Sequence, residues 1–168
     1  MKTFKQYIKE NIDAITIKGK TARPWKSTSV YKAALDDIIQ PGDRVLDYGS
    51  GPEKYQKVKQ HIINLGAEYY PYDSFNNIGS LVGGNDVVMG SNVLNTQVYE
   101  DDPLKAYNNA LDEMKDALSP TGTLVVNMPS NGPMADWMTP AQLNMDLMDR
   151  FNNVQRIKPG VFAASNPK

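Results

Sequence analysis

The stretch that most limits the fold of this 168-residue chain is residues 44–66, RVLDYGSGPEKYQKVKQHIINLG. A short apolar run leads into Asp47, and Gly49 and Gly51 follow almost at once. Apolar residues then recur at spacings of three and four, which predicts a helix that ends near Gly66. A strand, a glycine turn and a helix in direct succession are typical of sheets whose parallel strands are joined by helices.

The rest of the chain repeats this alternation of strand and helix patterns, with short connections between them. We expect strands at 68–73, from 85 onward, at 123–128 and, as a strand or hairpin, at 154–165; we expect helices at 4–12, 27–40, 103–118 and 139–151. This order predicts an α/β fold, Rossmann-like, with a mostly parallel sheet covered by helices on both faces. We expect residues 1–26 to form an N-terminal helix and a basic loop, and residues 27–168 to form the single compact domain.

Composition removes several kinds of chemistry. The chain has no cysteine, which excludes thiolate nucleophiles, cysteine-ligated zinc and iron–sulfur clusters. His61 is the only histidine, so a histidine-based metal site or a Ser-His-Asp triad is not expected. The net charge is −1, and neither a signal-peptide core nor a run of transmembrane length is present. We therefore expect a cytoplasmic protein that binds no metal and no membrane.

Two acidic residues limit the kinds of ligand that the glycine turn could bind. The dinucleotide fingerprint needs a glycine at position 54, where this chain has Lys54, and this disfavours a nicotinamide-binding domain. Asp47 would repel a pyrophosphate, but it suits a ligand that offers a cation or hydrogen-bond donors. Asp73 ends the second strand, where an acid can accept hydrogen bonds from a ribose diol. A ribose with a cationic, phosphate-free tail describes S-adenosyl-L-methionine. The alternative is that Gly49 and Gly51 serve only a tight turn that needs positive φ.

Four segments in this order carry a family resemblance: VLDYGSGP at 45–52, YYPYD at 69–73, DVVMGSNVLN at 86–95 and LSPTGTLVV at 118–126. Together they resemble the class I S-adenosylmethionine-dependent methyltransferases, over roughly residues 28–130. The chain is similar to small methyltransferases of this class, including those associated with DNA phosphorothioation systems. The family's third strand has little counterpart between Asn76 and Gly84. The resemblance implies the class I methyltransferase fold and S-adenosyl-L-methionine as cofactor.

The resemblance also assigns roles to residues in three loops. The first loop would line the methionine end of the cofactor, Asp73 would hold the ribose hydroxyls, and the loop from Gly90 would pass near the sulfonium and the acceptor. The implied cofactor-binding residues are Asp47, Gly49, Ser50, Gly51, Asp73, Ser74, Gly90 and Ser91. Asn92 and Asn95 are the candidate catalytic residues, although either could instead cap a helical turn.

The methyl acceptor cannot be read from the residues, and both a small molecule and a nucleic acid remain open. Cytosine C5 methylation is excluded, because it needs a cysteine nucleophile. The alternatives to methyl transfer are an enzyme that cleaves S-adenosylmethionine and a module that binds the cofactor without turning it over. The basic segment around Trp25 could stack a base, but a solvated loop explains it more simply. The methionine-rich C-terminal third would fit core packing, an apolar substrate wall or a homo-oligomer contact.

Overall fold

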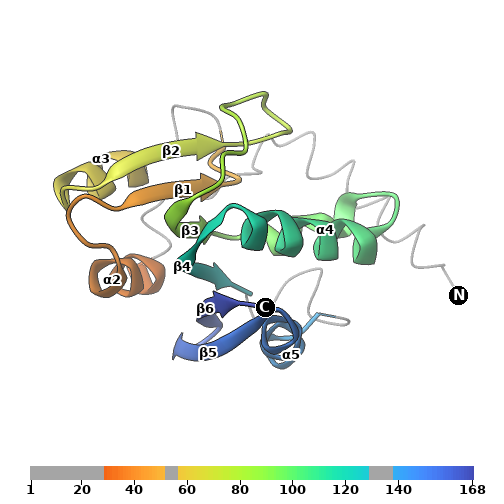
Figure 1. Cartoon of the computed structure of the whole chain (residues 1–168). Helices are drawn as coiled ribbons and strands as arrows, with labels where there is room; N and C mark the ends of the chain where they lie inside the picture. Colours follow the sequence, from red (N-terminus) through yellow and green to blue (C-terminus); the bar gives the residue numbers. More distant parts are fainter. Residues whose placement is uncertain (1–28, 52–56, 129–137) are drawn as a thin grey trace, which may run out of the picture.

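The computed structural model describes residues 29–51, 57–128 and 138–168. Within these ranges the chain forms one six-stranded sheet in the order β2-β1-β3-β4-β6-β5 (Figure 1). The elements in chain order are α2 (Ser29–Ile38), β1 (Arg44–Tyr48), α3 (Lys57–Asn64), β2 (Glu68–Tyr72), β3 (Asn85–Gly90), the 3-10 helix η3 (Leu94–Tyr99), α4 (Pro103–Asp116), β4 (Leu118–Asn127), α5 (Pro140–Arg150), β5 (Phe151–Lys158) and β6 (Val161–Pro167).

The sheet is parallel through its first four strands and antiparallel at the β5–β6 end. β1 pairs in parallel with β2 and β3, and β3 pairs in parallel with β4. β6 runs antiparallel to both β4 and β5. The predicted Rossmann-like α/β fold with a mostly parallel sheet is therefore confirmed. The predicted N-terminal helix and basic loop lie outside the described residues, so the boundary near residue 26 stays a prediction.

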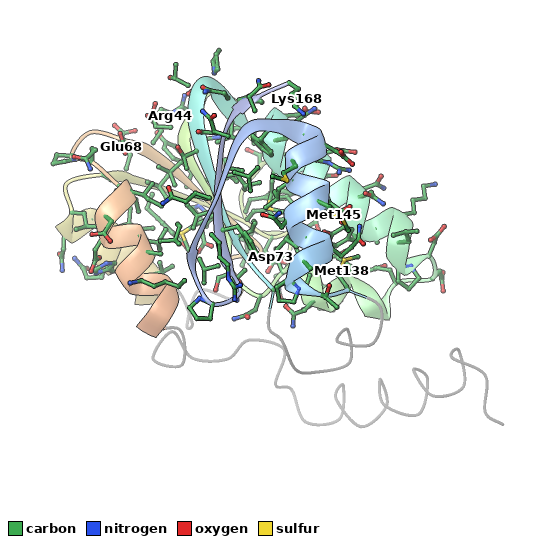
Figure 2. All side chains as sticks on the ribbon, turned by 90° about the horizontal axis from the view of Figure 1, so that it is seen from below. Arg44, Glu68, Asp73, Met138, Met145 and Lys168 are labelled. Atoms are coloured by element: carbon green, nitrogen blue, oxygen red, sulfur yellow. The ribbon has the colours of Figure 1, made fainter. Side chains whose placement is uncertain are left out.

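Successive residues along the central strands face opposite layers of helices. Val45 and Val87 pack with α2 and α3, whereas Leu46 and Val88 pack with α4 and α5. Figure 2 shows α2 on one side of the strands and α5 on the other. Strands buried on both faces must be apolar at nearly every position, which is why these strands appear in the sequence as continuous apolar runs.

The predicted helix starts are confirmed for the two C-terminal helices. The Asp102 side chain accepts a hydrogen bond from the Lys105 backbone N–H at the start of α4. Thr139 accepts from the Gln142 backbone N–H at the start of α5 in the same way. A proline follows each capping residue, at the first helical position, where no backbone donor is lost.

β2 is an edge strand, and its outer edge is closed to a further strand. The backbone N–H and C=O of Asp73 bond to Ile78, so they point away from β1. By alternation along the strand, the backbone of Pro71 points to the same outer side. Pro71 has no N–H to donate to another strand. A Cβ on Gly79 would lie 1.9 Å from the Pro71 carbonyl oxygen, so the chain folds back directly against this edge. These contacts explain why residues 74–84 hold no third strand.

Two helical positions differ from the expectations that their patterns raise. Leu104 falls in the apolar spacing of α4 but is 56% exposed, because the buried stripe extends towards Ala110 and leaves Leu104 at its margin. His61, on the polar side of α3, does not face solvent freely: it is mostly buried and contacts Asp36 of α2. The helices of the described ranges include none that is both long and apolar enough to cross a membrane.

Candidate functional site

The glycine turn and the end of β2 are joined by backbone contacts at the carboxyl edge of the parallel strands. The Tyr72 carbonyl accepts hydrogen bonds from the Gly49 N–H at 2.7 Å and the Ser50 N–H at 3.1 Å. One residue on, the Gly51 N–H donates to Asp73 Oδ2 at 2.9 Å. The sequence-predicted residues of the first two loops are thus brought together, at the edge where α/β sheets bind ligands.

Backbone conformation and packing account for the glycines of this site without a ligand. Gly49 and Gly51 have φ of +76° and +69°, which favours glycine at both positions. A Cβ on Gly49 would lie 2.7 Å from Val93 Cγ2, and one on Gly90 would lie 2.7 Å from Met114 Sδ and 3.1 Å from Val93 Cγ1. The loop after β3 therefore docks on the glycine turn through Val93. What favours a ligand here is the pair of acids rather than the glycines.

Asp47 is a buried carboxylate at the end of β1, only 4% exposed. Its Oδ2 accepts a hydrogen bond from the Tyr69 hydroxyl at 2.7 Å. The pKa of Asp47 is raised to about 6, chiefly by burial; the Tyr69 hydrogen bond opposes this shift, and the negative charge of Asp73 adds to it. No ion pair involves Asp47 in the described part of the chain. A buried acid whose one side-chain partner among the described residues is a phenol suits a cationic group, such as the ammonium of S-adenosylmethionine.

The Asp73 carboxylate organises the loop that follows β2. Its Oδ1 accepts from the Asn76 backbone N–H at 2.9 Å, and its Oδ2 accepts from Asn76 Nδ2 at 3.0 Å in addition to the Gly51 N–H. Ser74, next to it, is exposed. A ribose diol that bound both oxygens of Asp73 would have to compete with the Asn76 side-chain amide. Asn76 was missed at the sequence level, although an Asp followed by Asn three residues later is a recognisable turn signal.

An asparagine pair fixes the loop that leaves β3. The Asn92 N–H donates to Asn127 Oδ1 at 2.7 Å, and Asn127 Nδ2 donates back to Asn92 Oδ1 at 2.8 Å. Asn92 has φ of +56°, in the left-handed region. Ser91, before it, is half-buried, and Asn95 lies in η3 with its Oδ1 buried and unbonded among the described residues. The structure therefore places both candidate catalytic asparagines here, but Asn92 is already held by Asn127, which the sequence did not single out.

Loss of this pair should measurably destabilise the protein. Asn127→Ala removes both hydrogen bonds to Asn92 and leaves its half-buried N–H without a partner, so we expect unfolding to become easier by about 1–3 kcal/mol. Asn152→Ala is the matched control, because Asn152 makes one exposed hydrogen bond to the Asn166 carbonyl; its change should stay within about 0.5 kcal/mol. Urea denaturation measures both. Equal effects of the two substitutions would mean that the pair does not hold the loop.

One further acidic residue, Asp86, lies away from this site. Asp86 accepts from the Arg44 backbone N–H at 2.9 Å, which fixes the starts of β1 and β3 at the opposite end of the strands. Within residues 29–51, 57–128 and 138–168, no group of three or more His, Asp or Glu side chains could hold a metal ion.

Comparison with known proteins supports the fold. No protein-family model and no curated protein matches the sequence. Among solved structures, an S-adenosylmethionine-dependent methyltransferase from Aquifex aeolicus superposes with a TM-score of 0.53 at 16% identity, over 80% of this chain and 87% of that one. The apo form of the S-adenosylmethionine-dependent methyltransferase SibL gives 0.54 at 19% identity, over 86% of this chain and 56% of its own.

A third similar structure is not named as a methyltransferase. A possible exported protein from Bordetella parapertussis gives a TM-score of 0.57 at 14% identity, over 85% of this chain and 68% of that chain. At these identities the matches bear on the arrangement of the strands and helices, and not on the reaction. In that arrangement, the chain resembles the class I S-adenosylmethionine-dependent methyltransferases.

Proposed function

We propose that this protein is an S-adenosylmethionine-dependent methyltransferase whose acceptor is a small molecule or a nucleic acid. The observation that carries the proposal is the pair of carboxylates, Asp47 and Asp73, which lie at two adjacent strand ends, close enough for the charge of Asp73 to raise the pKa of Asp47. One acid is buried with no cationic partner among the described residues, and the other is half-buried beside it. A cofactor with an ammonium group and a ribose diol matches these two positions.

In this proposal the protein positions reactants and supplies little chemistry of its own. S-adenosylmethionine carries a methyl group that its sulfonium already activates. Asp47 would bind the ammonium, Asp73 would bind the ribose hydroxyls, and the loop from Gly90 to Asn95 would border the place where the acceptor approaches. Orientation and exclusion of water then provide most of the rate increase, and a base is needed only for an acceptor that must lose a proton.

Two alternatives share the same cofactor site. An enzyme that cleaves S-adenosylmethionine would need the same contacts to the ammonium and the ribose. A module that binds the cofactor without turning it over would need them too. A cytoplasmic location, a homo-oligomeric state and an association with DNA phosphorothioation stay predictions. Methyl transfer is preferred because the solved structures with this arrangement of strands and helices include S-adenosylmethionine-dependent methyltransferases, among them the Aquifex aeolicus protein and SibL.

Two measurements on the full chain test the proposal. Calorimetry with S-adenosylhomocysteine should show stoichiometric binding, and the ligand should raise the melting temperature because it binds only the folded state. Chromatography of S-adenosylmethionine incubated with the protein alone should show no loss of cofactor, since methyl transfer requires an acceptor. Accumulation of 5′-methylthioadenosine would instead identify a cleaving enzyme. Absence of S-adenosylhomocysteine binding would refute the cofactor assignment.

A further inference from the structure

A polar slot of about 230 Å³ lies beside the candidate cofactor site, between the ends of β1 and β2 and one side of α4. Tyr48 and Tyr72 form its sheet side, with ring centroids 5.2 Å apart. Asn109 and Glu113 belong to α4, and Glu100 lies three residues before that helix begins. The slot is separate from Asp47, which faces the opposite layer of helices through its contact with Tyr69.

The slot exists because no helix connects β2 to β3. Residues 73–84 contain only a turn and the bridge from Asp73 to Ile78, so among the described residues α4 is the helix on this side of β1 and β2. Ala106, Asn109 and Glu113 recur at spacings of three and four, which puts them on one side of α4. The small side chain of Ala106 leaves room between the helix and the tyrosines.

The lining of the slot favours positive charge. Glu113 accepts a hydrogen bond from the Tyr48 hydroxyl at 2.5 Å, which holds its carboxylate at the wall. Glu100 is exposed, and no ion pair involves Glu100 or Glu113 in the described ranges. The described residues that line the slot include no lysine, arginine or histidine. Two carboxylates beside two aromatic rings, with no resident cation, form an environment that attracts an organic cation.

We infer that this slot binds the positively charged part of the methyl acceptor, a protonated amine or another organic ammonium. The inference rests on the proposed function, because it makes the slot's ligand the acceptor. Residues of the slot are next in sequence to residues of the candidate cofactor site: Tyr48 precedes Gly49 of the glycine turn, and Ser74 follows Asp73. An ammonium held by Glu113 and Glu100 would therefore lie next to the bound cofactor.

A matched pair of probes tests the charge requirement. 2-Phenylethylammonium should bind the full-length protein saturated with S-adenosylhomocysteine, and neutral 2-phenylethanol should bind at least about tenfold more weakly. Glu113→Gln should weaken binding of the ammonium about tenfold or more and leave the alcohol unchanged. Asp116→Asn is the control, since Asp116 is an exposed acid of the same helix outside the slot. Should Glu113→Gln fail to fold, Glu100→Gln provides the same test at an exposed position.

The outcomes separate this inference from the proposed function. Equal binding of the two probes, or an unchanged affinity for the ammonium in Glu113→Gln, would overturn the inference while binding of S-adenosylhomocysteine stood. Competition between S-adenosylhomocysteine and the ammonium would also overturn it, because the slot would then belong to the cofactor. If only the ammonium bound, the proposed function would fail, and with it the identification of the ammonium as an acceptor.

Discussion

Replacement of Asp73 by alanine is expected to weaken S-adenosylhomocysteine binding by about 2–4 kcal/mol, or roughly 30- to 1,000-fold in Kd. The substitution removes the acceptor for both ribose hydroxyls. It also removes the acceptor of the Gly51 N–H, which joins the glycine turn to the end of β2. Calorimetry on the folded variant measures the loss, with the melting temperature as a check on the fold.

Asn76→Ala is the control for this experiment. It deletes the Nδ2 bond to Asp73 Oδ2 but keeps the backbone N–H bond to Oδ1, so the loop retains one of its two contacts from Asn76. Since the Asn76 amide competes with the ribose for the same oxygen, we expect Kd to change by less than about threefold. A folded Asp73→Ala variant with an equally small change would show that the ribose is bound elsewhere.

Asp47→Asn is expected to stabilise the protein without cofactor while it weakens cofactor binding. Burial raises the pKa of Asp47 from 3.8 to about 6, so the folded state holds the proton more tightly than the unfolded state does. The ionised carboxylate therefore costs stability that develops as pH rises from about 4 to about 6 and persists above it. A shift of this size corresponds to about 2–3 kcal/mol, and asparagine avoids it.

Asp47→Asn should therefore gain stability over the unmodified protein, and this gain in unfolding free energy should be about 2 kcal/mol larger at pH 8 than at pH 4.5. Urea denaturation at the two pH values measures it, and the comparison cancels any packing effect that does not depend on pH. Affinity for S-adenosylhomocysteine should fall about tenfold or more, because the ammonium loses its charged partner. Parallel stability profiles of the two proteins would contradict a buried, ionised Asp47.

The parts of the fold that local signals determine could be predicted from the sequence. The strand, glycine turn and helix of residues 44–66 contain their own apolar periodicity and turn residues, and so do the capped helices that begin after Asp102 and Thr139. The lack of a clear strand after β2 could also be seen, because residues 76–84 are rich in glycine and asparagine.

The partners of the site residues could not be predicted in this way. Tyr69 reaches Asp47 from the neighbouring strand, and Asn127 reaches Asn92 across 35 positions of the sequence. Such pairs depend on which strands are neighbours and on their register, and no short pattern records either. The slot beside α4 was missed for the same reason: it is formed by Tyr48 and Glu113, which are 65 residues apart in the sequence and on different elements.

β6 follows β5 in the sequence but lies between β4 and β5 in the sheet. The order in which these strands are synthesised therefore differs from their order in the sheet. When β5 emerges, β4 offers an open edge to which β5 does not pair. The turn at Gly160 makes β5 and β6 a local hairpin, which can form within microseconds and then dock through β6 as one unit. A nascent chain paused before residue 161 would leave the β4 edge unpaired and exposed to aggregation or chaperone binding.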